Sequence, residues 1–128
     1  MTTLFGSTDF IDGSQTASFL SLGGGANPAP SEAAGGDAIL PYGGTLSNLQ
    51  ASAVPSSGSG TVKITVEKND AGTVLTCTIS AGEPLGTEKT CSDTSDSVTF
   101  AAGDKITILV NNGTGNFVRY VRWAAQYQ

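Results

Sequence analysis

The sequence predicts an all-β domain: an antiparallel two-sheet jelly-roll sandwich of about eight strands with an extended N-terminal segment. Three observations carry this prediction. From Gly60 to Ser80, apolar and polar residues mostly alternate with period two, the spacing of a half-buried strand. Gly accounts for 17 of the 128 residues, and turn sequences recur between short apolar segments. No stretch sustains the apolar period of about 3.6 residues that is typical of an amphipathic helix.

Residues 1–16 are polar and mixed, and their main apolar side chains are Phe5, Phe10 and Ile11. We expect an N-terminal arm that docks on a neighbouring subunit, because three large apolar side chains are costly to leave exposed. A frayed terminus is the alternative, and it is the more common fate of such segments. The regular sheet is expected to occupy residues 17–128, the jelly-roll domain.

The strands before the hairpin are short segments between turns. Three glycines at 23–25 end the first strand, and the prolines and glycines of residues 26–36 cannot hold a ladder, so we expect a loop there. Leu46 breaks step with Leu49, which suggests a β-bulge near residues 47–48. The expected strands in this part of the chain are residues 17–22, 37–42 and 45–54.

The hairpin is the clearest element. Its first arm places Val62, Ile64 and Val66 on one side of an extended chain. Residues 69–72, Asn-Asp-Ala-Gly, tolerate positive φ and predict the reversal. Val74 is the one apolar exception on the outward face of the second arm. The inward side chains of that arm are Leu75, Cys77 and Ile79.

Four further strands are expected after the hairpin, at residues 88–92, 97–100, 105–110 and 117–127. The last of these carries apolar side chains on both faces, which indicates a central strand or contact with a partner subunit. One face carries Phe117, Arg119, Val121 and Trp123, and the other carries Val118, Tyr120 and Arg122. We expect Trp123 in the core. The candidate interface residues are Phe5, Phe10, Ile11, Arg119, Tyr120 and Arg122.

The two cysteines can be placed by arithmetic. If the reversal after the hairpin is centred on Pro84, then Cys77 faces Cys91. Directly opposed residues have Cβ atoms near the separation that a disulfide requires. A reduced pair is the alternative, and it is the expectation for a protein made in a reducing cytoplasm. We expect the thiols to be reduced at synthesis and able to form a disulfide after release.

Composition excludes several kinds of partner. Lys and Arg number 6 and Asp and Glu number 11, so the net charge is −5. This balance argues against nucleic acid as a partner, because phosphate binding needs clustered Lys and Arg. No apolar run is long enough to span a bilayer, and the first residues show no basic segment followed by an apolar one. We therefore expect no membrane partner and synthesis in a cytoplasm.

The sequence gives little support for a catalytic role. The chain has no histidine, which is the commonest general base and metal ligand. The carboxylate pairs Asp93 with Asp96 and Glu83 with Glu88 lie in or beside expected turns, where acidic residues are mostly turn-forming or solvated. Residues 93–96 offer oxygen ligands for calcium, but their spacing does not match an EF-hand loop. We expect no enzymatic activity, no metal and no cofactor.

Five short segments carry a resemblance to a known group of proteins. They are Gly-Thr-Leu-Ser-Asn-Leu at 44–49, Leu-Thr-Cys-Thr-Ile-Ser at 75–80, Thr-Cys-Ser-Asp-Thr at 90–94, Ala-Ala-Gly-Asp at 101–104 and Arg-Trp at 122–123. Together they resemble small jelly-roll proteins of tailed bacteriophages and bacterial genomes. The best understood of these are head decoration (cement) proteins on the outside of the capsid. The resemblance covers about residues 17–128, and it implies no active-site residues.

This resemblance implies a structural virion protein, a decoration subunit that binds the outer surface of a phage head and staples capsomers. The implied partner is the major capsid protein, and the implied assembly is a homo-oligomer, either a dimer or a trimer. The expected location is the capsid surface, after synthesis in the host cytoplasm. The alternative is a receptor- or glycan-binding module of a phage tail fibre or cell-surface fibre. Tyr42 and Phe117 are the aromatic residues near expected loops that would serve it.

Overall fold

The computed structural model describes residues 2–22 and 37–128. Within these residues all regular elements are strands, so no helix is available to cross a membrane. The glycines at 23–25 and the loop predicted at residues 26–36 lie outside the described residues. The strands are β1 (Thr2–Ile11), β2 (Ala17–Leu20), β3 (Ala38–Ile39), β4 (Gly44–Pro55), β5 (Thr61–Lys68), β6 (Ala71–Ser80), β7 (Lys89–Phe100), β8 (Lys105–Asn112) and β9 (Val118–Tyr127).

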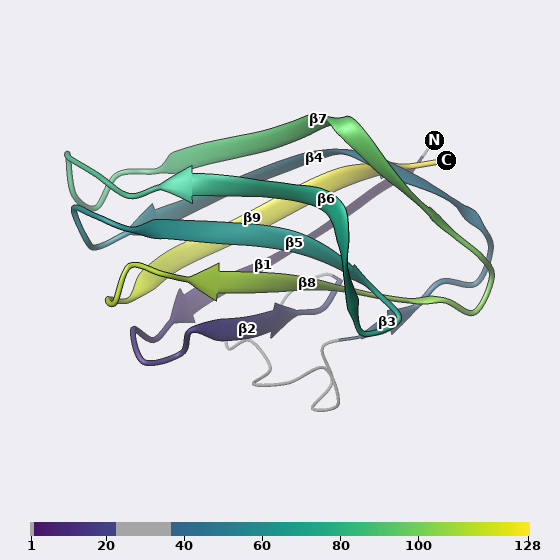
Figure 1. The fold of residues 1–128 in the computed structure, drawn as a ribbon, viewed down its shortest axis with the longest axis horizontal. Coiled ribbons are helices and arrows are strands. Elements are labelled where there is room, and N and C mark those ends of the chain that lie inside the picture. The colour runs from purple at the N-terminus through teal and green to yellow at the C-terminus, as the bar shows by residue number, and fades with distance from the viewer. Residues whose placement is uncertain (1, 23–36) are drawn as a thin grey trace.

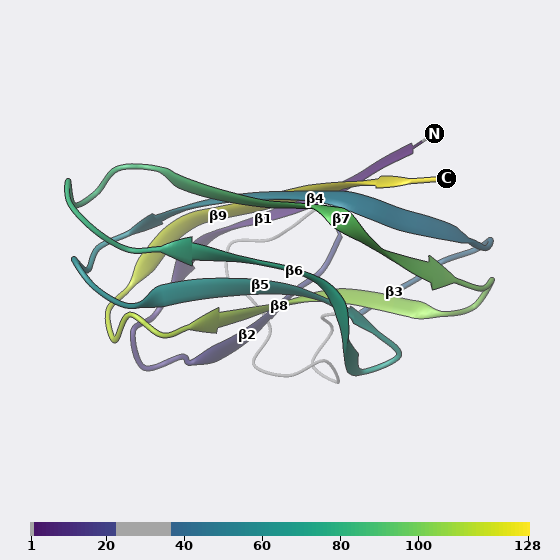
Figure 2. The same cartoon turned by 45° about the horizontal axis from the view of Figure 1, so that its top comes forward.

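The strands form two antiparallel sheets that pack face to face (Figure 1). One sheet has the strand order β1-β9-β4-β7, and the other has the order β2-β8-β5-β6 with β3 added to β8. Figure 2 shows the sheets as two layers, with both termini at the same end of the molecule. The predicted all-β, two-sheet sandwich is therefore confirmed.

The β5–β6 hairpin follows the predicted pattern except at Thr65 and Glu67, where the register shifts and both side chains are buried instead of facing outward. Lys68 pairs with Ala71, so Asn69 and Asp70 form a two-residue turn with φ angles of 50° and 67°. Both angles lie in the left-handed region that the tightest hairpin turns require. Val74 is exposed, as predicted. The side chains predicted to point inward are all buried: Val62, Ile64, Val66, Leu75, Cys77 and Ile79.

The core lies between the two sheets and takes side chains from both. Trp123 is only 3% exposed, so its predicted place in the core is confirmed. The strands next to the hairpin and at the end of the chain contribute the buried side chains Ile106, Ile108, Val110, Val118, Val121, Ala125 and Tyr127.

Residues 2–11 are the main departure from the prediction. They form β1, which pairs with β9 from Thr2 opposite Tyr127 to Ile11 opposite Val118. The predicted division into an arm at 1–16 and a sandwich at 17–128 is therefore wrong for these residues, which belong to the sheet. The strand was hard to recognise because two of its buried positions hold Gly6 and Thr8 instead of large apolar side chains.

A second departure concerns β7. The sequence predicts a polar corner at residues 93–96, whereas β7 runs through it without a break. Leu49 of β4 pairs with Asp93, and Ser47 pairs with Ser97, so the extra residues of β7 form a bulge. Asn48, with a φ of 56°, lies opposite them, which confirms the bulge predicted at residues 47–48.

A further bulge changes the faces of β9. Tyr120 has a φ of 52°, and the register with β4 shifts at this point. As a result, Val118 and Val121 both point into the core, although they are three residues apart. Phe117 is partly exposed, so the predicted grouping of Phe117 with Val121 on one face is wrong. A bulge re-aims side chains in this way because the extra residue breaks the period-two alternation.

Candidate functional site

The predicted interface residues separate into three groups. Ile11 is 0% exposed and belongs to the core, so it is not an interface residue of the folded chain. Phe5 of β1 is 61% exposed and lies opposite Ala124. Phe10 lies directly opposite Arg119 in the β1–β9 ladder. Tyr120 and Arg122 follow Arg119 along β9, and both are exposed.

Phe117, which was not among the predicted interface residues, completes a cluster with them. The rings of Phe10 and Phe117 are stacked, with centroids 5.6 Å apart and an interplanar angle of 24°. The Cζ atom of Arg119 lies 6.0 Å from the Phe10 centroid and 5.5 Å from the Phe117 centroid. We call Phe10, Phe117, Arg119, Tyr120 and Arg122 the aromatic–arginine surface.

Backbone geometry puts these side chains on the outside. Because of the β9 bulge, Arg119 and Tyr120 are both exposed although they are consecutive. Phe117 is held by the neighbouring loop, since its carbonyl oxygen accepts hydrogen bonds from the Ser56 N–H at 3.3 Å and the Ser56 hydroxyl at 2.6 Å. The end of β1 and the start of β9 lie at the end of the sandwich opposite the termini (Figure 1).

The turn before Phe117 is rigidly bonded. The Asn112 side chain donates to the Asn116 carbonyl at 2.8 Å and accepts from the Thr114 hydroxyl at 2.7 Å. Asn112 is 3% exposed, so this residue of an Asn-Gly-Thr sequence serves the turn. This network fixes the point at which β9 begins, and with it the position of the aromatic–arginine surface.

A shallow hollow of about 400 Å³ adjoins this surface. It lies where the β4–β5 and β6–β7 loops approach the start of β9, and Leu85 of the β6–β7 loop is 49% exposed beside it. Its lining residues are Val54, Pro55, Ser56, Leu85, Gly86, Phe117, Arg119 and Tyr120. The hollow is mainly apolar, and an arginine stands at its wall.

The two arginines differ in their partners. Arg122 lies 5.9 Å from the Tyr120 centroid and 3.6 Å from a Glu88 carboxylate oxygen. Both members of that ion pair are more than half exposed, so water screens it and it contributes little to stability. Arg119 has neither an ion pair nor a hydrogen bond to any side chain in residues 2–22 and 37–128.

A second, wider groove of about 590 Å³ lies on the outer face of the β1-β9-β4-β7 sheet. Its lining includes the small polar side chains Ser52, Thr90 and Ser92. Arg122 borders this groove, so the aromatic–arginine surface and the groove are adjacent. The groove offers hydrogen-bonding groups but no exposed aromatic side chain among its lining residues.

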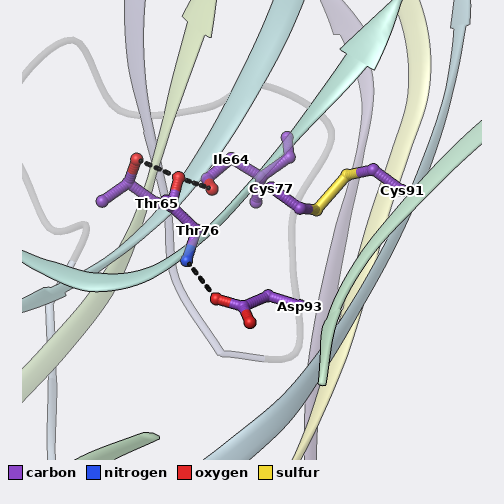
Figure 3. Close-up of a disulfide and its surroundings, with 6 residues drawn as sticks. All are labelled: Ile64, Thr65, Thr76, Cys77, Cys91 and Asp93. Carbon is purple, nitrogen blue, oxygen red and sulfur yellow. Dashed lines mark hydrogen bonds between the residues drawn. A yellow bond between two sulfur atoms is a disulfide. The ribbon is translucent and has the colours of Figure 1, made fainter. Parts of the chain in front are cut away.

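The two cysteines form the predicted pair. Cys77 of β6 and Cys91 of β7 are joined by a disulfide with a Cα–Cα distance of 5.7 Å (Figure 3). Their setting differs from the prediction, because β6 and β7 end different sheets and are not a cross-strand pair. The bond therefore ties the two sheets together along one side of the sandwich. Cys91 also lines the groove that Arg122 borders, so the disulfide lies beside the edge of the aromatic–arginine surface.

Asp93, considered as a calcium ligand, instead serves the backbone. One carboxylate oxygen accepts the N–H groups of Ser95 and Asp96, both at 3.1 Å, and the other accepts the N–H of Thr76 at 3.2 Å. Burial would raise the pKa of Asp93, but these hydrogen bonds outweigh it and lower the pKa. Among the described residues there is no group of carboxylates or cysteines arranged to hold a metal ion.

Comparison with known proteins gives the fold. No protein-family model and no curated protein matches the sequence. Among solved structures, the chain is similar to the native structure of a family 35 carbohydrate binding module from Clostridium thermocellum, at 12% identity and a TM-score of 0.42. That match covers 68% of this chain and 65% of the module, just under two thirds of its length. The chain is also similar to Eiger TNF from S. frugiperda, at 14% identity and a TM-score of 0.50, over 97% of this chain and 90% of that one. The second likeness spans the whole sandwich, and the chain has the jelly-roll fold.

Proposed function

We propose that the protein is a non-catalytic structural subunit of a tailed-phage particle. It attaches to the outer surface of the head, contacts the major capsid protein and staples neighbouring capsomers. The sequence resemblance to small phage jelly-roll proteins supports this proposal, and the jelly-roll fold is compatible with it. The observation that carries it is the aromatic–arginine surface, which gives the chain a defined place to attach.

The composition of that surface is typical of protein–protein interfaces. Tyr, Phe and Arg are enriched in such interfaces, and Tyr and Arg are among the commonest hot-spot residues. Phe10, Phe117 and Tyr120 are between 37% and 43% exposed. Burying them against a partner would remove apolar surface from water and so favour attachment.

Attachment at one end of the sandwich suits a stapling role. A stable interface buries about 800 Å² on each partner. A dimer or trimer of this chain would present several copies of the surface to neighbouring capsomers. Each further contact is then intramolecular, so the assembly binds more tightly than one subunit without any new type of contact.

The lack of histidine supports a non-catalytic role, because histidine is the side chain used most often in general acid–base catalysis. Asp93, the most buried aspartate of the β7 bulge, is committed to three backbone N–H groups and is not free to exchange protons with a substrate.

Immunogold electron microscopy tests the proposal. Antibody raised against the recombinant protein is applied to purified virions of the phage that encodes the chain. We expect gold on the outside of the heads, and the protein in the virion fraction by mass spectrometry. Absence of the protein from virions, or gold confined to the tail tip, would contradict a decoration role.

A receptor- or glycan-binding module is the second candidate. The hollow beside Phe117 and Tyr120 favours it, because ligand pockets often lie among loops at one end of a sandwich and combine apolar walls with a few polar groups. A glycan array probed with labelled protein would test it. Selective binding that is lost in Tyr120→Ala would support this candidate, and no binding to any glycan would count against it.

A further inference from the structure

The guanidinium of Arg119 packs against two rings and has no hydrogen-bond acceptor among residues 2–22 and 37–128. The Phe10 and Phe117 rings lie on it at centroid distances of 6.0 and 5.5 Å. No carboxylate in the part of the chain that the structure describes lies within ion-pair distance of it. Its N–H donors are therefore available to a partner, since guanidinium carries five of them in a planar fork.

The rings restrict this side chain before any partner arrives. An arginine side chain that is free in solvent loses considerable conformational entropy when it binds a partner. Stacking against two rings already restricts Arg119, so less entropy is lost on binding. The fork of a stacked guanidinium matches a carboxylate in a bidentate pair. Arg119 is thus better prepared for a carboxylate than the exposed lysines of the chain are.

Two observations decide what carries that carboxylate. Sugar recognition by aromatic residues uses an open ring face. Phe10 and Phe117 instead stack on each other with Arg119 beside both rings, and Arg122 covers one face of Tyr120. Long polyanions such as nucleic acid or acidic polysaccharide are opposed by the net charge of −5. A single carboxylate within a largely apolar contact fits both observations, and a folded or extended polypeptide supplies it.

We propose that Arg119 receives an Asp or Glu carboxylate of a partner protein, flanked by apolar side chains that pack on Phe10, Phe117 and the hollow beside Leu85. This inference rests on the proposed attachment function and names the chemistry of the attachment partner. Arg119 is a local positive charge surrounded by apolar side chains, so it attracts a single acidic group. The net negative charge of the whole protein repels an extended anion.

A random-peptide library displayed on yeast tests this directly. Labelled wild-type protein selects binders, and the affinities of the enriched peptides are then measured for wild type, Arg119→Gln and Lys63→Gln. Lys63 is an exposed lysine of β5 in the other sheet, so its replacement makes the same change in net charge away from the surface. Thermal unfolding of each variant confirms that the domain is intact.

We expect enriched peptides to place Asp or Glu beside apolar residues. Their affinity should fall about tenfold or more in Arg119→Gln and stay near the wild-type value in Lys63→Gln. Replacing the peptide carboxylate by its amide should cause a similar loss, with no further loss in Arg119→Gln.

Peptides without an excess of carboxylates, or equal binding by Arg119→Gln, would overturn the inference. Tighter binding of an oligogalacturonate than of any peptide would also overturn it, in favour of an acidic glycan. These outcomes are separate from the virion test. If gold labels the phage heads but Arg119→Gln binds the peptides as the wild type does, the proposed function is kept and attachment is attributed to the aromatic side chains.

Discussion

Gly6 of β1 lies directly opposite Trp123 of β9, with no room for a side chain between them. A Cβ built at Gly6 would lie 2.7 Å from the indole nitrogen and 2.8 Å from the backbone oxygen of Ser21. Trp123 therefore fills the space that a side chain of β1 would otherwise occupy. This contact explains why a buried strand position carries glycine, and it makes β1 part of the core packing.

Gly6→Ala should lower the free energy of unfolding by about 1–3 kcal/mol, because the added methyl group meets both the indole and a backbone oxygen that cannot move cheaply. Urea unfolding followed by the fluorescence of the single tryptophan measures this. Gly82→Ala is the matched control, since a Cβ there has nothing within 4 Å. Equal stabilities of the two variants would show that β1 does not press on Trp123.

Deleting residues 1–16 should leave a chain that aggregates or unfolds without a cooperative transition. The deletion removes β1, exposes the edge of β9 and takes the fully buried Ile11 out of the core. Losing a buried Ile side chain alone costs about 2–5 kcal/mol, a large part of the stability of a small domain. Solubility and the thermal midpoint by circular dichroism measure the effect.

Ile11→Ala in the full chain is the milder companion to this deletion, and it should fold with a lower midpoint. A truncated protein that is soluble and melts at the wild-type temperature would show instead that residues 2–11 are an independent arm.

Much of the sandwich was predictable because it follows local rules. The β5–β6 hairpin shows a mainly alternating pattern around an Asn-Asp turn, and both features depend only on neighbouring residues. The bulge near Asn48 was visible because Leu46 and Leu49 are both apolar at a spacing that a regular strand does not allow. The Cys77–Cys91 pair followed from the short connection between the strands that carry the cysteines.

The remaining features depend on contacts that are distant in sequence. The sequence predicts an arm in place of β1, because the glycine at position 6 is explained by contacts with Ser21 and with Trp123, which is more than a hundred residues away. The stack of Phe10 on Phe117 requires β1 and β9 to be neighbours, and nothing local to either segment indicates this. The positive φ of Tyr120 is likewise set by tertiary packing, because bulky residues rarely adopt it on their own.

Removing the disulfide should lower stability by about 3 kcal/mol, the value expected for closing a loop of about 15 residues. The double variant Cys77→Ala, Cys91→Ala removes the bond between β6 and β7. The two cysteines are 14 positions apart in the sequence. Urea unfolding gives the difference. Dithiothreitol should bring the wild type to a similar value and leave the double variant unchanged. If dithiothreitol left the stability of the wild type unchanged, the disulfide would not be what stabilises the joint between β6 and β7.

Glu67→Gln should raise stability at neutral pH. Glu67 is 7% exposed, and one of its carboxylate oxygens has no partner in the described residues. Burial, and then the charges of Asp70 and Asp37, raise its pKa above the ordinary value of 4.5. A raised carboxyl pKa means that the folded state holds the proton more tightly than the unfolded state. The wild type therefore loses stability as the pH rises from 4.5 through the raised pKa.

The glutamine variant is neutral throughout and avoids that loss. Its advantage in thermal midpoint should be present at pH 7 and disappear below pH 4.5. Asp96→Asn, which makes the same charge change at an exposed position, is the control. An advantage of Glu67→Gln that is the same at every pH would show that the carboxylate charge is not its cause.

We propose that the aromatic–arginine surface attaches the chain to the phage head. Co-sedimentation with purified phage heads that have been stripped of the protein measures this for wild type, for the double variant Phe10→Ser, Phe117→Ser, and for Val74→Ser. Val74 is a matched control, because it is an exposed apolar residue on the other sheet. We expect the double variant to keep its fold by circular dichroism and to lose at least about tenfold in affinity. Val74→Ser should bind as the wild type does. A folded double variant that saturates the heads at the wild-type concentration would contradict the claim.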